Sequence, residues 1–261
     1  MLIQITNTCH GNCIHCLQDS TPEPQHMSME TFEQFLKFCI NTPTTTVNIS
    51  GGEPTEHPYF EEIVRDCAKH FHIVTIISNG FFVFNREKYL LVKKLLTLDN
   101  VFLQVTTHKL YYPKYKEICA KKDKFIALGR KCAIAINPDI YILQLGRAAN
   151  NELCKANAVN HKFTTSCLMG TSTFWQLPFN IAILNMESRF HFCTPLIDWQ
   201  GYIHLSESWK CPHIGHVSTF NNFMDIVKAK PCGKCADYQK ILDNNSPQYV
   251  AIKQIMGINK D

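Results

Sequence analysis

Three cysteines near the start of the sequence have the spacing of an iron–sulfur cluster site. Cys9, Cys13 and Cys16 form a C-x3-C-x2-C run within eight residues. A loop can wrap three thiolates around a compact cubane, where they hold three irons of a [4Fe-4S] cluster and leave the fourth iron open. An open metal position indicates chemistry rather than a purely structural role. The run therefore predicts a reactive cluster.

Disulfide bonding and zinc binding are the alternative uses of these cysteines. The chain begins Met1-Leu2-Ile3-Gln4-Ile5, which lacks the basic and long apolar regions of a signal peptide. We therefore expect a cytoplasmic protein, in which 13 cysteines indicate metal or redox work rather than disulfides. Structural zinc sites usually have four ligands in paired C-x2-C spacing, which fits the first three cysteines poorly.

The composition predicts an ordinary globular core and excludes some partners. With 261 residues, of which 45% are hydrophobic, the chain can form one large α/β domain with or without a small appendage. A net charge of +4 is too mild to indicate nucleic acid binding, and the run Lys121-Lys122-Asp123-Lys124 is interpreted as a solvated helix face. No run approaches the roughly 18 apolar residues that span a membrane, so no membrane partner is expected.

Strand-like and helix-like segments alternate along the first half of the chain. β-branched and apolar runs predict strands at 2–6, 45–50, 72–78, 101–106, 133–137 and 180–184. Apolar residues at helical spacing predict helices at 29–40, 60–70, 86–96 and 115–128, with a weaker signal at 147–160. This order predicts a parallel sheet with helical crossovers that curls into a partial (β/α)6 barrel, with its chemistry on the loops after the strands.

A glycine turn follows the second predicted strand. Gly51 and Gly52 allow close approach of the backbone to a ligand, Pro54 stiffens the exit, and Glu53 is available to accept from an ammonium group. A plain tight turn is the alternative. Together with the cysteine run, in this order, the turn resembles the Gly-Gly-Glu-Pro motif of the radical S-adenosylmethionine (SAM) family. The resemblance implies that the open iron binds SAM and that residues 51–54 hold its amino group.

Two further residue groups resemble SAM contacts of that family. Ser78-Asn79-Gly80 ends the third predicted strand and resembles a Thr/Ser-Asn-Gly motif that faces the ribose or methionyl part of SAM. His15 precedes the third cysteine, where the family commonly places an aromatic ring against the adenine. An ordinary turn and a plain surface residue remain the alternatives.

The fourth and fifth strand ends carry the remaining candidates in this half. The sequence Gln104–His108 departs from the Ser-x-Asp-Gly pattern of many relatives, which leaves Thr106 or Thr107 as the best substitute for a ribose contact. His108 has a side chain suited to proton removal near neutral pH, with a simple polar contact as the alternative. Arg147 lies in a Gly-Arg-Ala segment that resembles that of relatives with extra clusters, which implies a contact to the SAM carboxylate. A helix-start arginine is the alternative.

Four cysteines lie in the last quarter of the chain: Cys193, Cys211, Cys232 and Cys235. A predicted hairpin at 197–205 and a helix at 220–229 lie among them. This layout resembles the twitch appendage, an abbreviated SPASM domain, and implies one auxiliary [4Fe-4S] cluster. A closed zinc site remains the alternative because four thiolates with a terminal C-x2-C also fit zinc. We expect a core barrel over 1–185 and a twitch-like domain over 186–261.

The resemblance implies an oxidoreductase that cleaves SAM reductively to a 5'-deoxyadenosyl radical. The radical would abstract a hydrogen from a substrate C–H bond, with a flavodoxin or ferredoxin as electron donor. Peptide maturation, such as crosslinking or thioether formation, is favoured by analogy. Dehydrogenation of a small alcohol, activation of a glycyl radical enzyme, and a non-enzymatic metal-binding module are the alternatives.

Overall fold

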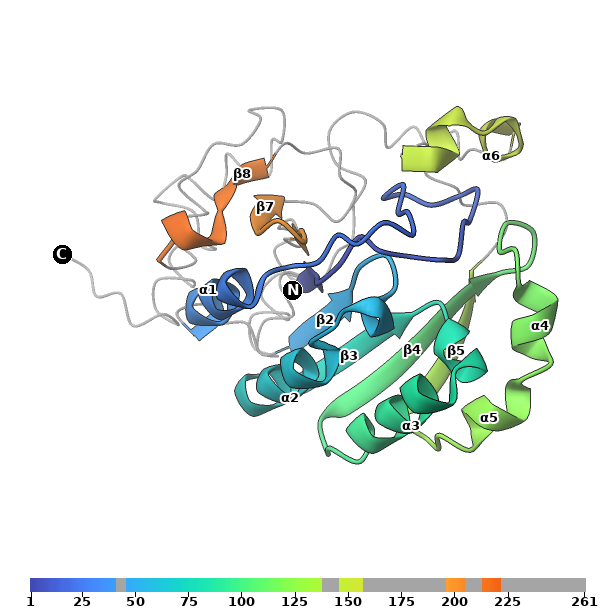
Figure 1. Ribbon diagram of the computed structural model, residues 1–261, viewed down its shortest axis with the longest axis horizontal. Helices are drawn as coiled ribbons and strands as arrows, with labels where there is room; N and C mark the ends of the chain where they lie inside the picture. Colours follow the sequence, from blue (N-terminus) through green and yellow to red (C-terminus); the bar gives the residue numbers. More distant parts are fainter. Residues whose placement is uncertain (41–45, 138–145, 157–195, 205–212, 222–261) are drawn as a thin grey trace, which may run out of the picture. The chain divides into compact units, whose positions relative to one another are not determined.

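The computed structural model describes residues 1–40, 46–137, 146–156, 196–204 and 213–221 (Figure 1). The chain divides into two compact units. One unit, called here the site unit, contains Ile3–Met27 and Asn48–His161, and the other contains Met1–Leu2, Ser28–Val47 and Lys162–Asp261. Each unit is described separately below.

The strands whose carboxyl ends lie in the site unit follow the order β5-β4-β3-β2-β1, and β1 and β2 begin in the other unit. Their bounds are Leu2–Gln4 (β1), Thr46–Ser50 (β2), Ile73–Ser78 (β3), Val101–His108 (β4) and Cys132–Asn137 (β5). Strand β4 pairs in parallel with β3 on one side and with β5 on the other. The predicted α/β fold with a mainly parallel sheet is therefore confirmed, and the carboxyl ends of these strands lie at one edge.

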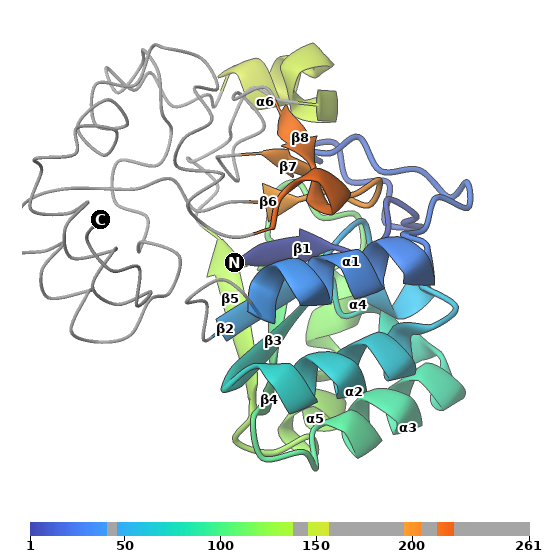
Figure 2. The same cartoon turned by 90° about the vertical axis from the view of Figure 1, so that its left-hand side faces the viewer.

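Two long helices cover one face of this sheet. Helices α2 (Phe60–His70) and α3 (Arg86–Leu95) lie side by side along it (Figures 1 and 2). The strands supply alternate side chains to the buried layer, all at most 1% exposed: Val74, Ile76, Val101, Leu103 and Val105. Burying each such side chain contributes roughly 1.5–3 kcal/mol, so this layer holds the strand ends in place.

The segment after β4 differs from the single helix predicted at 115–128. The structure has two short helices, α4 (Tyr115–Cys119) and α5 (Lys122–Ile126). Between them the N–H of Lys121 donates to the carbonyl of Ile118, a tighter three-residue turn. Only Ile118 and Phe125 in these helices are buried, so little packing favours one continuous helix.

In the other unit, helix α1 spans Met29–Ile40 as predicted, and a hairpin confirms another prediction. Strands β6 (Leu196–Ile197) and β7 (Tyr202–His204) are antiparallel, and β7 also pairs with β8 (His213–His216), a strand that the sequence did not indicate. The carboxylate of Asp198 fixes the turn, because it accepts from the N–H groups of Gln200 and Tyr202.

Several predictions fall outside the described residues. They concern the strand at 180–184, most of the helix at 220–229, the far end of the helical signal at 147–160, and Cys193, Cys211, Cys232 and Cys235. The described part of the 147–160 signal forms a 3-10 turn at Gly146–Asn150 followed by α6 (Glu152–Ala156). Within the described ranges, no helix combines the length and the apolar character needed to cross a bilayer.

Candidate active site

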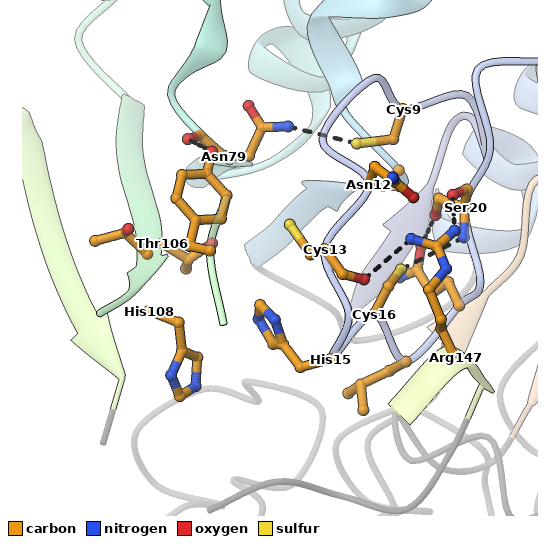
Figure 3. Close-up of a pocket in the computed structure, with 16 residues that line it drawn as sticks. Cys9, Asn12, Cys13, His15, Cys16, Ser20, Asn79, Thr106, His108 and Arg147 are labelled. Carbon is orange, nitrogen blue, oxygen red and sulfur yellow. Dashed lines mark hydrogen bonds between the residues drawn. The ribbon is translucent and has the colours of Figure 1, made fainter. Parts of the chain in front are cut away.

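A pocket with a volume of about 370 Å³ lies in the site unit, at the carboxyl ends of β2, β3 and β4 (Figure 3). This volume is in the range of small-molecule sites in proteins. Most of the residues predicted from the sequence for a site line this pocket: Cys9, Cys13, His15, Cys16, Gly51, Gly52, Asn79, Thr106, His108 and Arg147. Segments up to 138 residues apart in the sequence, from Cys9 to Arg147, therefore meet at one cavity.

Some of the predicted residues do not line the pocket, and some residues that were not predicted do. Glu53, Pro54 and Ser78 are not among the lining residues and lie behind the pocket wall. Thr107, the alternative to Thr106, also lines the pocket, as do residues that the sequence had not singled out: Asn12, Leu17, Gln18, Ser20 and Tyr112. Of these, Asn12 and Leu17 lie next to a predicted cysteine in the sequence, which was the available signal for them.

Residues 9–20, called here the cysteine loop, form neither helix nor strand along most of their length. Asn12 (φ 46°) and Asp19 (φ 51°) are left-handed, a conformation that Asn and Asp tolerate best among residues with side chains. Gly11 lies against two sulfurs, because a Cβ there would be 3.2 Å from Cys9 Sγ and 3.5 Å from Cys13 Sγ. The loop thus keeps space clear around its thiols.

Backbone and amide N–H groups point at two of the three sulfurs. Cys9 Sγ accepts from the N–H of Gly11 at 3.3 Å and from Asn79 Nδ2 at 3.5 Å. Cys16 Sγ accepts from the N–H of Ser20 at 3.4 Å. Such donors stabilise negative charge on sulfur and tune iron–sulfur clusters. The donor set therefore fits a [4Fe-4S] cluster.

The arrangement of the thiols bears on the kind of metal group that the loop could hold. In the described parts of the chain, no three His, Cys, Asp or Glu side chains are grouped so that they could hold one metal ion. A cubane takes one thiolate at each of its irons, so its ligands surround it and do not converge on one point. The loop is compatible with this requirement.

The two thiols nearest the strand ends are neutral when they hold no metal. Burial raises the pKa of Cys9 to about 11 and that of Cys13 to about 12. The guanidinium of Arg147 acts in the opposite direction on the pKa of Cys13, but burial dominates. Because metals bind the thiolate, loading of the loop must release protons.

The glycine turn brings the end of β2 against the chain that enters the cysteine loop. The N–H of Gly52 donates to the carbonyl of Thr6 at 2.7 Å, and that of Glu53 donates to Thr8 at 2.9 Å. A Cβ on Gly51, whose φ is 153°, would lie 2.3 Å from the Thr6 carbonyl oxygen. Only glycine permits this approach, which fixes the distance between the two sides of the pocket.

Glu53 lies behind the pocket, 1% exposed, and not facing it. Its carboxylate accepts from Thr55 Oγ1 at 2.8 Å, from Ser78 Oγ at 2.9 Å and from the N–H of Asn79 at 2.8 Å. Burial raises the pKa of Glu53, while these hydrogen bonds act in the opposite direction. These hydrogen bonds hold the turn at 78–79, and the side chain of Asn79 faces the cysteines.

Two histidines meet at the mouth of the pocket. The ring centroids of His15 and His108 are 4.7 Å apart, and both rings contact Tyr111. Burial, reinforced by His108, lowers the pKa of His15 to about 4, so its ring is neutral near pH 7. Among the described residues nothing hydrogen-bonds to Nδ1 of His15 or to Oγ1 of Thr107, although both atoms are buried. Buried polar atoms without partners are rare, and a ligand in the pocket can satisfy them.

Arg147 is engaged with the cysteine loop, as the dashed lines of Figure 3 show. Its guanidinium donates to Cys13 O at 3.0 Å, to Ser20 O at 2.6 Å and to Asp19 Oδ1 at 2.9 Å. Its backbone N–H donates to Cys16 O at 2.9 Å. These contacts involve the loop itself, whereas the sequence pointed to a contact with SAM.

Comparison with known proteins gives several partial relatives. The subtilosin biosynthesis protein AlbA of Bacillus subtilis is 32% identical over 78 residues, which cover 30% of this chain and 17% of AlbA. The mycofactocin maturase MftC of Mycobacterium ulcerans is 32% identical over 78 residues, 30% of this chain and 21% of the relative. The GTP 3',8-cyclase of Haemophilus ducreyi is 28% identical over 85 residues, which cover 30% of this chain and 25% of the relative. The matched segment is therefore at most a quarter of these relatives' length.

Two solved structures share the fold at low sequence identity. Streptococcus suis SuiB, bound to S-adenosylmethionine, has a TM-score of 0.51 and 12% identity, with 95% of this chain and 74% of SuiB covered. Native anSMEcpe with bound AdoMet and Cp18Cys peptide has a TM-score of 0.51 and 11% identity, with 98% and 82% covered. At these identities the likeness shows the fold alone.

These partial relatives do not establish the family of the protein, but a family model does. The model described as the radical SAM superfamily matches residues 3–138, which is just over half of the chain. This range contains the cysteine loop, the glycine turn and the Ser78-Asn79 turn, whose geometry is given above. The protein belongs to the radical SAM superfamily.

Proposed function

We propose that the protein is an enzyme that reductively cleaves SAM and abstracts hydrogen from a C–H bond of a peptide substrate. The observation that carries this proposal is the shared pocket: three thiols suited to a cluster lie on one side, and polar strand ends suited to SAM lie on the other. When bound, the cluster supplies the electron that converts SAM to methionine and a 5'-deoxyadenosyl radical. The protein's own groups bind, orient and shield the reactants.

The residues divide these tasks by position. Cys9, Cys13 and Cys16 hold the cluster, and the amide of Asn79 lies 3.5 Å from Cys9 Sγ. The backbone at Gly51 and Gly52 lines the pocket with no side chain in the way, which suits the amino group of SAM.

The other side of the pocket suits the nucleoside part of SAM and the substrate. The neutral ring of His15 offers a flat face to the adenine, and Thr106 and Thr107 offer hydroxyl groups to the ribose. His108, at the end of β4, lies where it can hold or accept a proton of the substrate.

The choice of a peptide substrate is supported by what the relatives' names say of those proteins. AlbA is a bacteriocin biosynthesis protein, and anSMEcpe was solved with a bound peptide. GTP 3',8-cyclase, which acts on a nucleotide, is also a relative, and it favours a small molecule as the second candidate. Oxidation of a small alcohol belongs to that second class.

We further propose that the distal cysteines hold an auxiliary [4Fe-4S] cluster in a twitch-like domain over 186–261, beside a core barrel over 1–185. Support comes from the sequence, where Cys193, Cys211, Cys232 and Cys235 supply four thiols. An acidic flavodoxin or ferredoxin in the cytoplasm would deliver the electron.

The central experiment is anaerobic reconstitution followed by addition of dithionite and SAM, with 5'-deoxyadenosine measured by chromatography. The wild-type protein is expected to form 5'-deoxyadenosine, and Cys13→Ala is expected to form none. Cys119→Ala is the matched control because this thiol is exposed on α4. Equal product from the wild type and Cys13→Ala would refute the enzyme assignment.

Iron counting and mass spectrometry test the finer parts. About eight irons per chain fit two four-iron clusters, whereas about four irons with bound zinc refute the auxiliary cluster. A substrate peptide is expected to lose a pair of hydrogens in the full reaction: one hydrogen atom passes to the 5'-deoxyadenosyl radical, and the substrate radical then gives an electron to the auxiliary cluster and releases a proton. If small alcohols instead of peptides raise the yield of 5'-deoxyadenosine, the second candidate replaces the first.

A further inference from the structure

Residues 146–156, called here the latch segment, contact the cysteine loop at successive positions. The segment begins with a 3-10 turn and continues into α6. It lies about 130 residues after the loop in the sequence, and both belong to the site unit. Most of its hydrogen bonds reach backbone carbonyls of the loop, so they restrict the conformation of the loop.

Arg147 is the centre of these contacts. Its three guanidinium bonds reach Cys13 O, Asp19 Oδ1 and Ser20 O, and its own N–H reaches Cys16 O. The guanidinium therefore joins the carbonyls of Cys13 and Ser20, which lie seven residues apart in the loop. A planar guanidinium holds several acceptors in a fixed relative geometry, which a lysine ammonium cannot do.

The flanking residues of the latch segment add steric and apolar contacts. Gly146, with φ 52°, lies so close to the loop that a Cβ would be 2.4 Å from Leu17 O. Cys154 Sγ donates to Ile14 O at 3.6 Å, and Ile14 packs against Ala148 and Cys154. The latch segment therefore contacts the loop at several points between residues 13 and 20.

We propose that Arg147 is a positioning residue for the cluster, which holds the cysteine loop in its iron-binding conformation, and that it is not the residue that binds the SAM carboxylate. This inference rests on the proposed function, because it assumes that the loop holds the cluster. The loop has two left-handed residues, one of which, Asp19, is bonded by Arg147, so its conformation needs support from outside the loop.

The first test measures the loop without its cluster. Hydrogen exchange of the apo protein is followed for amides in 13–20, in the wild type, in Arg147→Gln and in the control Arg130→Gln, whose side chain is exposed. Exchange in this range is expected to rise in Arg147→Gln alone. Equal exchange in all three proteins would overturn the proposal, and this result does not depend on any SAM chemistry.

The second test measures iron retention against a chelator under anaerobic conditions. Arg147→Gln is expected to retain iron about 10- to 100-fold less well than the wild type, as for other residues that support metal ligands. Arg147→Lys should be intermediate, because one ammonium replaces only part of a three-contact fork. This graded order, together with a changed electron paramagnetic resonance line shape of the reduced cluster, distinguishes positioning from general loss of stability.

The third measurement decides between the loop and SAM as the target of Arg147. SAM affinity is compared at matched iron content, and Arg147→Gln is expected to bind SAM within about threefold of the wild type. Normal iron retention with SAM binding weakened tenfold or more would overturn the proposal. If Arg147→Gln does not fold, Asp19→Asn, which weakens one of the three contacts, is expected to show the same losses to a smaller degree, and its wild-type behaviour in all three measurements would overturn the proposal.

Discussion

The pocket has two walls that are built in different ways. The strand-end wall follows β2, β3 and β4, and the ladder of a parallel sheet places its residues. The loop wall is the cysteine loop, whose position depends on side-chain hydrogen bonds from a distant segment, such as those of the guanidinium of Arg147 to Cys13 O and Ser20 O. One wall is set by a repeating backbone pattern, the other by individual side chains.

The strand-end wall and the loop wall should therefore respond differently to substitution of a single side chain. In the strand-end wall, a side chain can change while the backbone ladder keeps its neighbours in place. In the loop wall, each contact is made once, so loss of one contact moves several loop residues. The two walls meet at the glycine turn, where the N–H groups of Gly52 and Glu53 donate to the carbonyls of Thr6 and Thr8 and set the separation of the walls.

Gly52→Ala is expected to have the largest effect because it separates the walls. A Cβ at Gly52 would lie 2.5 Å from Thr8 O, a backbone atom that cannot move aside cheaply. We expect a loss of about 3 kcal/mol or more in the free energy of unfolding. Urea denaturation of the apo protein measures it. Gly129→Ala is the control, because nothing lies within 4 Å and only its φ of 83° opposes a side chain, at a cost of about 1–2 kcal/mol. Equal losses would show that the walls are not in tight contact there.

Glu53→Gln is expected to weaken the strand-end wall alone. The amide retains one oxygen but points N–H groups at donors of Thr55, Ser78 or Asn79, which leaves buried donors unpaired. The expected loss is about 1–3 kcal/mol in the free energy of unfolding. Glu62→Gln is the control, because this side chain is exposed on α2, and it should change the free energy of unfolding little. Hydrogen exchange should rise at 78–80 and stay unchanged at 13–20, and the opposite pattern would contradict the division into two walls.

His57 forms a pH-dependent hydrogen bond with Met27, in the segment that follows the cysteine loop. Its Nδ1 accepts from the N–H of Tyr59 at 3.0 Å, so Nε2 carries the proton and donates to Met27 O at 2.9 Å. Burial, with a smaller contribution from His26, lowers the pKa of His57 below 6.5.

The folded state therefore favours neutral His57, and this stability is present above pH 6.5 and lost as the pH falls toward the lowered pKa. Urea midpoints of the apo protein should fall between pH 6.5 and 5 in the wild type and fall less in His57→Gln. His10→Gln, whose ring is exposed, should follow the wild type. A wild-type slope in His57→Gln would assign the pH dependence to another group.

Tyr112→Phe is expected to have the smallest effect. The hydroxyl of Tyr112 donates to Asn79 O, and burial raises the pKa of Tyr112, so it remains a donor. Its loss should cost about 0.5–1.5 kcal/mol in the free energy of unfolding, because the ladder between β3 and β4 still holds the turn. A larger loss, measured by the same denaturation, would show that this wall also depends on single side chains.

The two walls also differ in what the sequence could predict. Helix α2 was predicted with its bounds, because apolar periodicity is a local signal, and the structure buries its periodic residues Phe60, Ile63, Val64 and Cys67. The placement of the strand ends in one pocket followed from the parallel order of the strands. Strand β4 nevertheless runs two residues past its predicted end, because its pairing with β5 continues to His108.

The loop wall was predictable only as a list of residue types. The spacing of the cysteines indicated a cluster, yet nothing local shows that Arg147 bonds to residues 13, 19 and 20, since that contact joins segments about 130 residues apart. Glu53 illustrates the same limit. A carboxylate after two glycines looks available to a ligand, and only the fold shows its hydrogen bonds to Ser78 and Asn79.

The long separation between the cysteine loop and Arg147 has a consequence for synthesis on the ribosome. At about 5–20 residues per second, the segment that bonds to the loop is made roughly 7–25 seconds after the cysteines themselves. During that interval the cysteine loop lacks its contacts with residues 146–156, so the sulfurs of Cys9, Cys13 and Cys16 are open to oxidants and stray metals. Assembly of the site is therefore ordered in time: the chain must complete residue 147 before the loop can take the conformation in which its thiols are enclosed.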